Sequence, residues 1–288
     1  MYKSTRPKKA HLSAGIGGEV ENLDREDPVI DGQRVNIVSI EHAIEVTIRE
    51  LSFGTDSFML CTLNMDHLVK RRENKEFAEA YSRALFVSAD GFPVVLLARM
   101  QGASLERTTG SDLILPLCSR AARERLSVYL IGGTPESVES ASLCLTSLCA
   151  GLTIAGTYAP PWPFDPASVL TDEIISAIIS SGARVCLVAL GAPLQELFAM
   201  RAIERSRRVA YVGVGASLDF LAGRQWRAPS LVRFLNLEWA WRLILNPRRL
   251  WLRYLKSGLL FVQLLGVQMI SHYTTRRPLR KSGSSDAV

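Results

Sequence analysis

The chain has 288 residues, enough for one large domain or for one domain with an appendage. Hydrophobic residues make up 48% and charged residues 22%, a composition that excludes disorder over most of the length. The net charge of +6 is unevenly distributed. The last 65 residues hold twelve Lys or Arg and two acids, whereas the first 223 residues hold 22 Lys or Arg and 26 acids. Basic charge at the C-terminal end indicates an anionic partner there.

Five cysteines occur without a CxxC pair, which argues against a disulfide framework or a zinc site and favours reduced thiols in the cytoplasm. Residues 1–30 are polar and lack the apolar core of a secretory signal, so they are expected to form a tail. In residues 31–223, short apolar runs alternate with helix-like stretches. The runs are almost continuously apolar, as is typical of strands buried on both faces of a mostly parallel sheet. The sequence therefore predicts an α/β domain with a Rossmann-like nucleotide-binding half.

The predicted elements follow in chain order. Strands are expected at 58–64, 84–90, 127–133, 152–162, 183–191 and 209–215, and helices at about 66–83, from 93, from 111, from 135, at 166–181 and at 193–206. Open sheets of this class bind ligands beyond the carboxyl ends of their strands. The residues expected at those ends are Asn64, Asp90, Gly132, Gly191 and Gly213.

Asp90 follows the apolar run ALFVSA and is a candidate general base, because a carboxylate at a strand end can be held near a substrate hydroxyl. Local sequence alone favours the alternative, a turn or capping aspartate before Gly91. Asn64 either orients a sugar through its amide or caps the helix that follows it.

Glycine turns are candidates for nucleotide binding. In YLIGGTPES, Gly132 and Gly133 precede a helix start, where free N–H groups can bind a phosphate, although a plain turn fits equally well. Gly191 opens the second candidate turn, GAPLQE, in which Glu196 is expected to be a favourable partner of the helix dipole. Arg107 is either a phosphate ligand or an exposed loop arginine.

Metal and hydrolase chemistry find little support. His67 is expected on a helix surface, no cluster of side chains has metal-ligand spacing, and no G-x-S-x-G elbow is present. A DxD metal motif is also absent from the sequence. No metal or other cofactor is therefore expected.

Near Gly223 the sequence becomes basic, aromatic and helical, which predicts an appendage over residues 224–272 and a polar basic tail over 273–288. Arg249, Arg253 and Lys256 share one helical face and are expected to meet a membrane or an acceptor. The apolar run at 258–270 has 13 residues, short of the roughly 20 that span a bilayer, so it should lie on lipid or, alternatively, pack on the core. Nucleic acid is disfavoured, because no RNP motif, zinc knuckle or helix-turn-helix accompanies the charge.

Eight motifs, in this order and spacing, resemble those of the WecG/TagA/CpsF glycosyltransferase family (glycosyltransferase family 26). The resemblance extends from about residue 35 to residue 254. The motifs are TLN at 62–64, ADG at 89–91, ERTTGSDL at 106–113, LIGG at 130–133, GAPLQE at 191–196, GVGASLDFLAG at 213–223, RAP at 227–229 and LEWAWRLILNPRRLWLRY at 237–254.

The resemblance implies an inverting transfer of a sugar from a UDP-sugar to a polyprenyl-diphosphate-linked saccharide in cell-surface polysaccharide synthesis. It makes Asp90 the base, places Thr62 and Asn64 at the substrate, and places Arg107 and Gln195 near the donor diphosphate and sugar. The donor sugar is expected to be a hexose or N-acetylhexosamine type, such as N-acetylmannosamine, its uronic acid, or glucose. The protein would work without a metal, in the cytoplasm, on the inner face of the plasma membrane, possibly as a homo-oligomer.

Two departures from the family pattern are Leu194, where a lysine is common, and Leu218, where a phenylalanine is common. Leu194 removes a positive charge near the expected site, so the identity of the donor sugar is left undetermined. Leu218 is expected to change packing only. Two other classes remain as alternatives: a nucleotide-sugar-binding module without turnover, and a basic nucleic-acid-binding protein.

Overall fold

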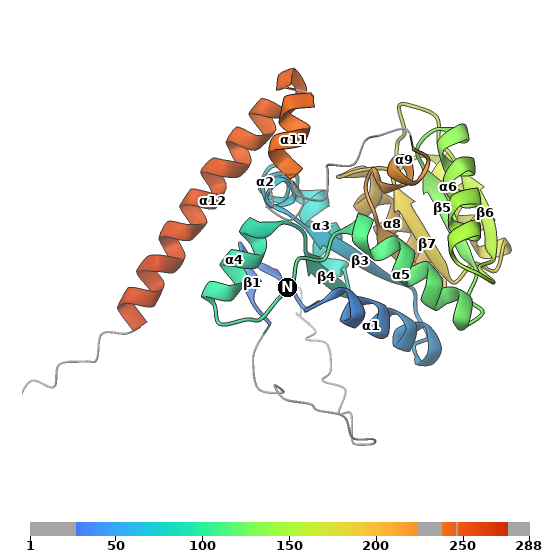
Figure 1. Cartoon of the computed structure of the whole chain (residues 1–288), viewed down its shortest axis with the longest axis horizontal. Helices are drawn as coiled ribbons and strands as arrows, with labels where there is room; N and C mark the ends of the chain where they lie inside the picture. Colours follow the sequence, from blue (N-terminus) through green and yellow to red (C-terminus); the bar gives the residue numbers. More distant parts are fainter. Residues whose placement is uncertain (1–26, 224–237, 246, 276–288) are drawn as a thin grey trace, which may run out of the picture.

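The computed structural model describes residues 27–223, 238–245 and 247–275 of the chain (Figure 1). Six parallel strands form one sheet in the order β4-β3-β8-β7-β5-β6, which confirms the predicted α/β class. A two-stranded antiparallel hairpin precedes the sheet. The strands are β1 Val29–Ile30, β2 Gln33–Arg34, β3 Phe58–Leu63, β4 Phe86–Ala89, β5 Val128–Gly132, β6 Ile154–Tyr158, β7 Val185–Ala189 and β8 Ala210–Gly213.

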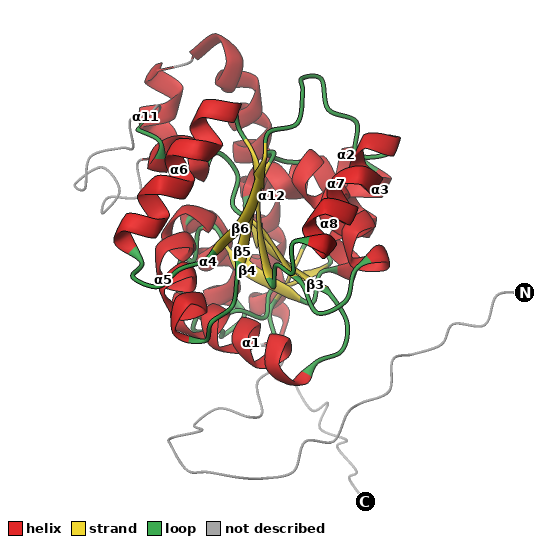
Figure 2. Cartoon of the chain, turned by 90° about the vertical axis from the view of Figure 1, so that its right-hand side faces the viewer, coloured by secondary structure: helices red, strands yellow, loops and turns green. Residues whose placement is uncertain are grey.

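Helices cover both faces of the sheet, as Figure 2 shows for α5 and α6 on one side and α7 and α8 on the other. One face carries α2 Met65–Glu73, α3 Lys75–Arg83, α4 Phe92–Met100, α7 Val169–Ser180 and α8 Leu194–Arg205. The opposite face carries α1 Ile40–Phe53, α5 Gly110–Arg123, α6 Pro135–Leu148 and α9 Ser217–Leu221. With apolar layers on both faces, β3, β5, β7 and β8 are buried along their whole length.

The connections create a topological switch point at the carboxyl ends of the strands. Helix α6 follows β5 on one face, whereas α8 follows the neighbouring strand β7 on the other. Loops that leave adjacent strands toward opposite faces separate from each other, and open α/β sheets bind ligands at such points. This topology supports the prediction that the functional residues lie at the strand ends.

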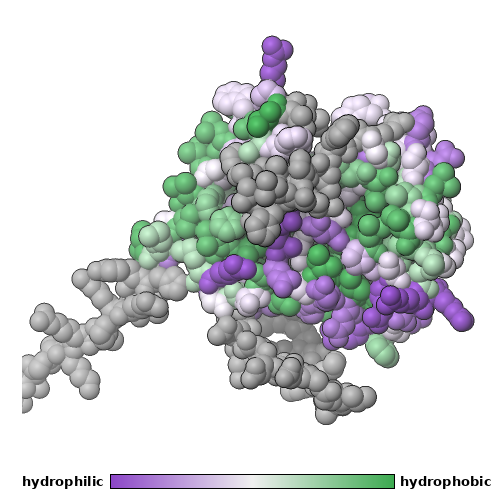
Figure 3. All heavy atoms as spheres, in the orientation of Figure 1, coloured by the Kyte–Doolittle hydropathy of each residue, from purple (hydrophilic) through white to green (hydrophobic). Residues whose placement is uncertain are grey.

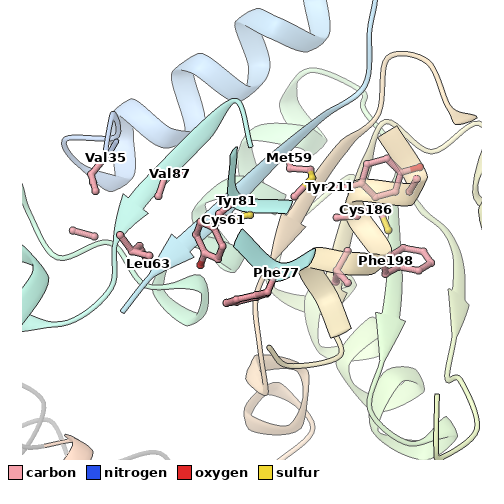
Figure 4. Packing of buried hydrophobic residues seen from close by; sticks show 14 of the residues in the cluster. Val35, Met59, Cys61, Leu63, Phe77, Tyr81, Val87, Cys186, Phe198 and Tyr211 are labelled. Atoms are coloured by element: carbon pink, nitrogen blue, oxygen red, sulfur yellow. The ribbon is translucent and has the colours of Figure 1, made fainter. Parts of the chain in front are cut away.

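Aromatic rings fill the core beneath α2, α3 and α8 (Figure 4). Phe77 and Tyr81 meet edge to face, as do Phe198 and Tyr211. His67 belongs to this core, so the prediction of a surface histidine is wrong. Its Nδ1 lies 2.6 Å from the Tyr81 hydroxyl, and burial lowers the pKa of His67 to about 3, so the ring is neutral at physiological pH.

Several local features differ from the sequence predictions. The single helix expected at 66–83 is two helices, because Asn74 ends α2 and caps α3 by accepting a 3.0 Å hydrogen bond from the Phe77 N–H. Helix α1, which was not predicted, starts at the N-cap Ser39. Val29 and Ile30, which were expected to belong to a tail over 1–30, form β1, and residues 1–26 fall outside the described part of the chain.

The C-terminal part is helical, as predicted, with α11 Glu238–Leu245 and α12 Pro247–Thr275. Helix α12 reaches three residues into the predicted tail of 273–288; residues 224–237 and 276–288 lie outside the described residues. It packs on α2 and α4, and Leu260, only 6% exposed, joins the core of the α/β domain (Figure 1). The apolar run is therefore partly a core element.

The opposite face of α12 is apolar and exposed. Leu252, Leu255, Leu259 and Val262 are each half exposed or more, and hydrophobic side chains gather along this helix in the space-filling view (Figure 3). Within the described chain, one segment, Leu250–Ile270, is long and apolar enough by length and composition to cross a membrane. The prediction takes the apolar segment to be the 13 residues 258–270. It is wrong about this length, because these residues belong to the longer apolar segment Leu250–Ile270.

Candidate active site

Two adjacent strands bring Asn64 and Asp90 together at the carboxyl edge of the sheet. Strands β3 and β4 are parallel neighbours, with Leu63 opposite Ala89, and the Asp90 N–H donates to the Leu63 carbonyl over 2.8 Å. The Asn64 Nδ2 lies 3.4 Å from Asp90 Oδ2, while its Oδ1 accepts a 3.0 Å hydrogen bond from the His67 N–H. Asn64 therefore caps α2, as one alternative predicted, and also presents its amide to Asp90.

Thr62 lies deeper in the sheet than these two residues. It is buried within β3, opposite Ser88 of β4, and its carbonyl accepts a 3.0 Å hydrogen bond from the Tyr81 hydroxyl. In a strand, residues two positions apart share a face, so the Thr62 side chain and Asn64 belong to the same side. Because Thr62 is buried below the strand end, it is expected to contact a substrate only if the substrate reaches past Asn64 into the sheet.

The loop that carries Arg107 is fixed to the end of β4. The Thr108 N–H donates to the Ala89 carbonyl over 2.8 Å, and the Ser88 hydroxyl donates to the Thr108 carbonyl over 3.0 Å. These bonds place the loop beside Asp90. Arg107 is half-buried there and lies 3.4 Å from Asp112, an acid in the first turn of α5.

The glycine turn after β5 has a structural explanation. Gly132 has a φ of 124°, and a Cβ at this position would collide with the carbonyl oxygen of Ala189 on β7. Thr134 then caps α6 and forms a capping box with Ser137. Gly133 precedes this cap with a φ of 69°. Gly132 is needed for close packing of β5 on β7, and a Cβ on Gly133 would collide with the Ser137 hydroxyl of α6. Nucleotide binding by the turn stays a prediction.

The turn after β7 is open on one side, because no atom lies within 4 Å of a Cβ built on Gly191. Beyond it, Gln195 is buried and connects two strand ends. Its Oε1 accepts a 3.0 Å hydrogen bond from the Gly215 N–H beyond β8, and its Nε2 donates to Glu196 Oε1 over 2.8 Å. Gln195 thus fixes the loop after β8 to the start of α8, and its contact with a substrate stays a prediction.

Glu196 is a buried acid, which the sequence prediction of a dipole partner missed. Only 1% of the residue is exposed, and within the described chain its Oε2 has no hydrogen-bond partner. Burial raises its pKa to about 7, against opposing effects of the Gln195 hydrogen bond and of Lys70. The helical spacing of Gln195, Phe198 and Ala202 could have indicated which face of α8 is buried. Glu196 adjoins this face, but a charged residue at such a position is normally expected to be exposed.

Replacing Glu196 with glutamine is expected to change how stability depends on pH. The folded pKa of about 7 exceeds the ordinary value of 4.5, so the folded state binds the proton more tightly and the free energy of unfolding falls as pH rises between these values. The shift corresponds to about 3 kcal/mol, and glutamine, which mimics the protonated acid, should remove this loss.

Urea unfolding at pH 5 and pH 8 measures the effect, with Glu76→Gln on the exposed surface of α3 as the matched control. The Glu196→Gln variant is expected to gain stability over the wild type at pH 8 relative to pH 5. An equal difference between the two proteins at both pH values would contradict a buried, proton-binding Glu196.

The basic face of α12 contacts α2. Arg253 Nη2 lies 2.9 Å from Asp66 Oδ2, and Lys256 Nζ lies 2.7 Å from Glu73 Oε1. These two of the three predicted acceptor or membrane residues therefore pair with acids of the α/β domain, while the side chain of Arg249 lies outside the described residues. Both basic side chains also stay exposed, 41% for Arg253 and 56% for Lys256.

Among the residues that the structure describes, no group of three or more His, Cys, Asp or Glu side chains could hold a metal ion. The polar groups at the carboxyl edge are instead an amide, a carboxylate, a guanidinium and glycine turns. Such a set can orient a hydroxyl, accept its proton and neutralise an anion.

The fold is that of a Rossmann-like α/β protein, with a candidate ligand site at the carboxyl edge of its sheet. The model of one protein family, described as "Glycosyl transferase WecG/TagA/CpsF family", matches residues 29–275. The chain belongs to this family, which confirms the resemblance seen in the sequence motifs. Membership makes it a glycosyltransferase of cell-surface polysaccharide synthesis, with a nucleotide-sugar and a lipid-linked acceptor as the general substrate classes.

Proposed function

We propose that the protein transfers a hexose or N-acetylhexosamine-type sugar from a UDP-sugar to a polyprenyl-diphosphate-linked saccharide, with inversion at the anomeric carbon. The observation that carries this proposal is the pairing of Asn64 with Asp90 at adjacent strand ends. An inverting transfer needs one base at the acceptor hydroxyl, and this carboxylate stands at the edge where substrates of such sheets bind.

In the proposed reaction, Asp90 accepts the proton of the acceptor hydroxyl, whose oxygen attacks the anomeric carbon on the face opposite to the leaving UDP. One C–O bond forms, the bond between the sugar and the diphosphate breaks, and UDP leaves with the electron pair. The Asn64 amide, 3.4 Å from Asp90 Oδ2 and held by its cap to α2, fixes the orientation of the carboxylate. Preorganised groups of this kind lower the barrier because they need no rearrangement during the reaction.

Positive charge for the leaving diphosphate is proposed to come from protein groups and not from a metal. Arg107 is anchored beside Asp90 through Thr108 and can donate two hydrogen bonds to phosphate oxygens. N–H groups at the glycine turns after β5 and β7 supply further donors. EDTA is therefore expected to leave activity intact, and a complete, reversible loss would contradict this part of the proposal.

The lipid-linked acceptor explains the exposed apolar face of α12. A polyprenyl tail cannot leave a bilayer cheaply, because each buried CH₂ contributes ~0.8 kcal/mol. The enzyme must come to the lipid, and α12 offers exposed leucines and a valine on a helix that packs against the α/β domain. We place the protein at the cytoplasmic face of the membrane, bound to the surface through this helix.

The decisive experiment is UDP release by the full chain, with a panel of UDP-sugars and a short polyprenyl-diphosphate saccharide. Release that requires both substrates supports the proposal, and the most active donor identifies the sugar. UDP-sugar binding without turnover across the panel would favour a non-catalytic binding module. Preference for duplex DNA over anionic liposomes at equal ionic strength would favour the nucleic-acid alternative.

A further inference from the structure

Lys70 reaches across the carboxyl edge of the sheet to the turn after β7. Its helix, α2, follows β3, whereas Ala192 follows β7, and β8 separates these two strands. The Lys70 Nζ nevertheless donates a 3.0 Å hydrogen bond to the Ala192 carbonyl. The lysine thus lies at the open turn of Gly191, although 122 residues separate it from Ala192 in the sequence.

Two acids and a second cation surround this ammonium group. Asp66 Oδ2 lies 2.7 Å from Lys70 Nζ and 2.9 Å from Arg253 Nη2, and the Asp66 side chain is only 13% exposed. Glu196 is close enough for Lys70 to influence its charge, and burial keeps this acid partly protonated near neutral pH. Two cations, Lys70 and Arg253, therefore share the single carboxylate oxygen Asp66 Oδ2.

An excess of positive charge in a partly enclosed site is costly unless an anion balances it. The Lys70 side chain is 29% exposed, so it is not sealed inside the domain. An ammonium has three N–H donors; within the described chain, the hydrogen bond printed for Lys70 uses one of them at the Ala192 carbonyl, while Asp66 is an ion-pair neighbour at 2.7 Å. The turn beside it is unobstructed at Gly191. These features fit a phosphate group of a nucleotide.

We propose that Lys70 is a further substrate-binding residue, whose ammonium contacts the diphosphate of the nucleotide donor at the turn after β7. Asp66 and the Ala192 carbonyl hold the ammonium in place, and Arg253 is a positioning residue that acts through Asp66. This inference rests on the proposed function, since it names a residue of the same donor site. It also gives the turn a positive charge that Leu194, an uncharged residue, does not supply.

The test compares the binding of UDP and of uridine by isothermal titration calorimetry, using the full chain. Lys70→Met is expected to weaken UDP binding by roughly 10- to 100-fold, because it removes one charge-assisted hydrogen bond to phosphate. Uridine, which lacks the diphosphate, is expected to bind the variant as it binds the wild type. Lys70→Arg keeps the charge and is expected to restore most of the UDP affinity. Lys75→Met, an exposed lysine of α3, is the matched control.

Equal UDP affinity of Lys70→Met and Lys75→Met would overturn the inference alone, provided that the wild type binds UDP. Equal losses for UDP and uridine would also overturn it, because they would indicate a structural role. A wild type that binds no UDP would overturn the proposed function and this inference with it.

The role of Arg253 is tested by a double-mutant cycle. Arg253→Gln is expected to weaken UDP binding in the wild-type background and to have no further effect in the Lys70→Met background. Equal losses in both backgrounds would overturn the positioning role of Arg253. Near-identical thermal unfolding of the variants and the Lys75→Met control would show that the comparison is made between folded proteins.

Discussion

Replacement of Asp90 by asparagine is expected to lower kcat by ~100-fold or more, because the variant keeps the shape of the side chain and loses the proton acceptor. The Asn64 amide lies 3.4 Å from the Asp90 carboxylate, so the site is already arranged to hold this group in one orientation. Donor affinity is expected to change little, since the base acts on the acceptor hydroxyl. Steady-state UDP release at saturating substrates measures kcat, and UDP titration measures donor affinity.

The matched control is Asp56→Asn, which removes an exposed aspartate that pairs with Arg207 at the opposite, amino edge of the sheet. Normal kcat is expected for this variant. If Asp90→Asn kept the turnover of the control, Asp90 would be a turn residue before Gly91, as local sequence alone suggests.

The second large effect is expected on membrane binding. Four apolar residues of α12, each half exposed or more, lie at helical spacing: Leu252, Leu255, Leu259 and Val262. Replacing all four with glutamine is expected to lower binding to anionic liposomes by ~100-fold or more, because each inserted side chain contributes on the order of 1 kcal/mol. Sedimentation with liposomes at fixed ionic strength measures the loss.

Activity separates docking from chemistry in this variant. It is expected to fall strongly on a membrane-embedded acceptor and to remain near normal on a short-tailed soluble one. The matched control replaces four exposed apolar residues of other helices with glutamine: Phe53, Leu143, Leu148 and Val169. Liposome binding as strong as that of this control would rule out docking through α12.

The basic residues of α12 are a less suitable target for this test than the sequence indicated. Arg253 and Lys256 pair with Asp66 and Glu73 of α2, so charge reversal would place acids against acids and release the helix from the domain. A loss of liposome binding would then have two explanations. Replacing the four exposed apolar residues leaves these ion pairs intact. A loss of liposome binding in that variant would therefore report on the contact of α12 with the membrane alone.

The strands could be predicted because burial on both faces demands continuous apolar runs, and VYLIG of β5 and VCLVA of β7 are such runs. Asn64 and Asp90 could be predicted for a related reason. A polar residue directly after a buried strand marks the edge where parallel strands end together, and Leu63 and Ala89 are opposite each other in the register.

Contacts between distant parts of the chain could not be predicted in this way. Lys70 and Ala192 meet only because α2 passes over the end of β8, and no local pattern encodes that crossing. His67 and Glu196 look like surface residues of amphipathic helices, yet both are buried where a second layer of structure covers them. Burial by tertiary packing thus changed the interpretation of both titratable side chains.

The packing of α12 on α2 has a consequence for the length of the acceptor. A bilayer bound to the outer face of α12 would be separated from α2 by the thickness of one helix, ~10 Å. Helix α2 begins directly after Asn64, so the reacting carboxylate is near the membrane surface on this arrangement. On this arrangement, a short saccharide on its lipid diphosphate would be enough to reach Asp90. The enzyme would therefore act early in chain assembly, while the growing saccharide is still short.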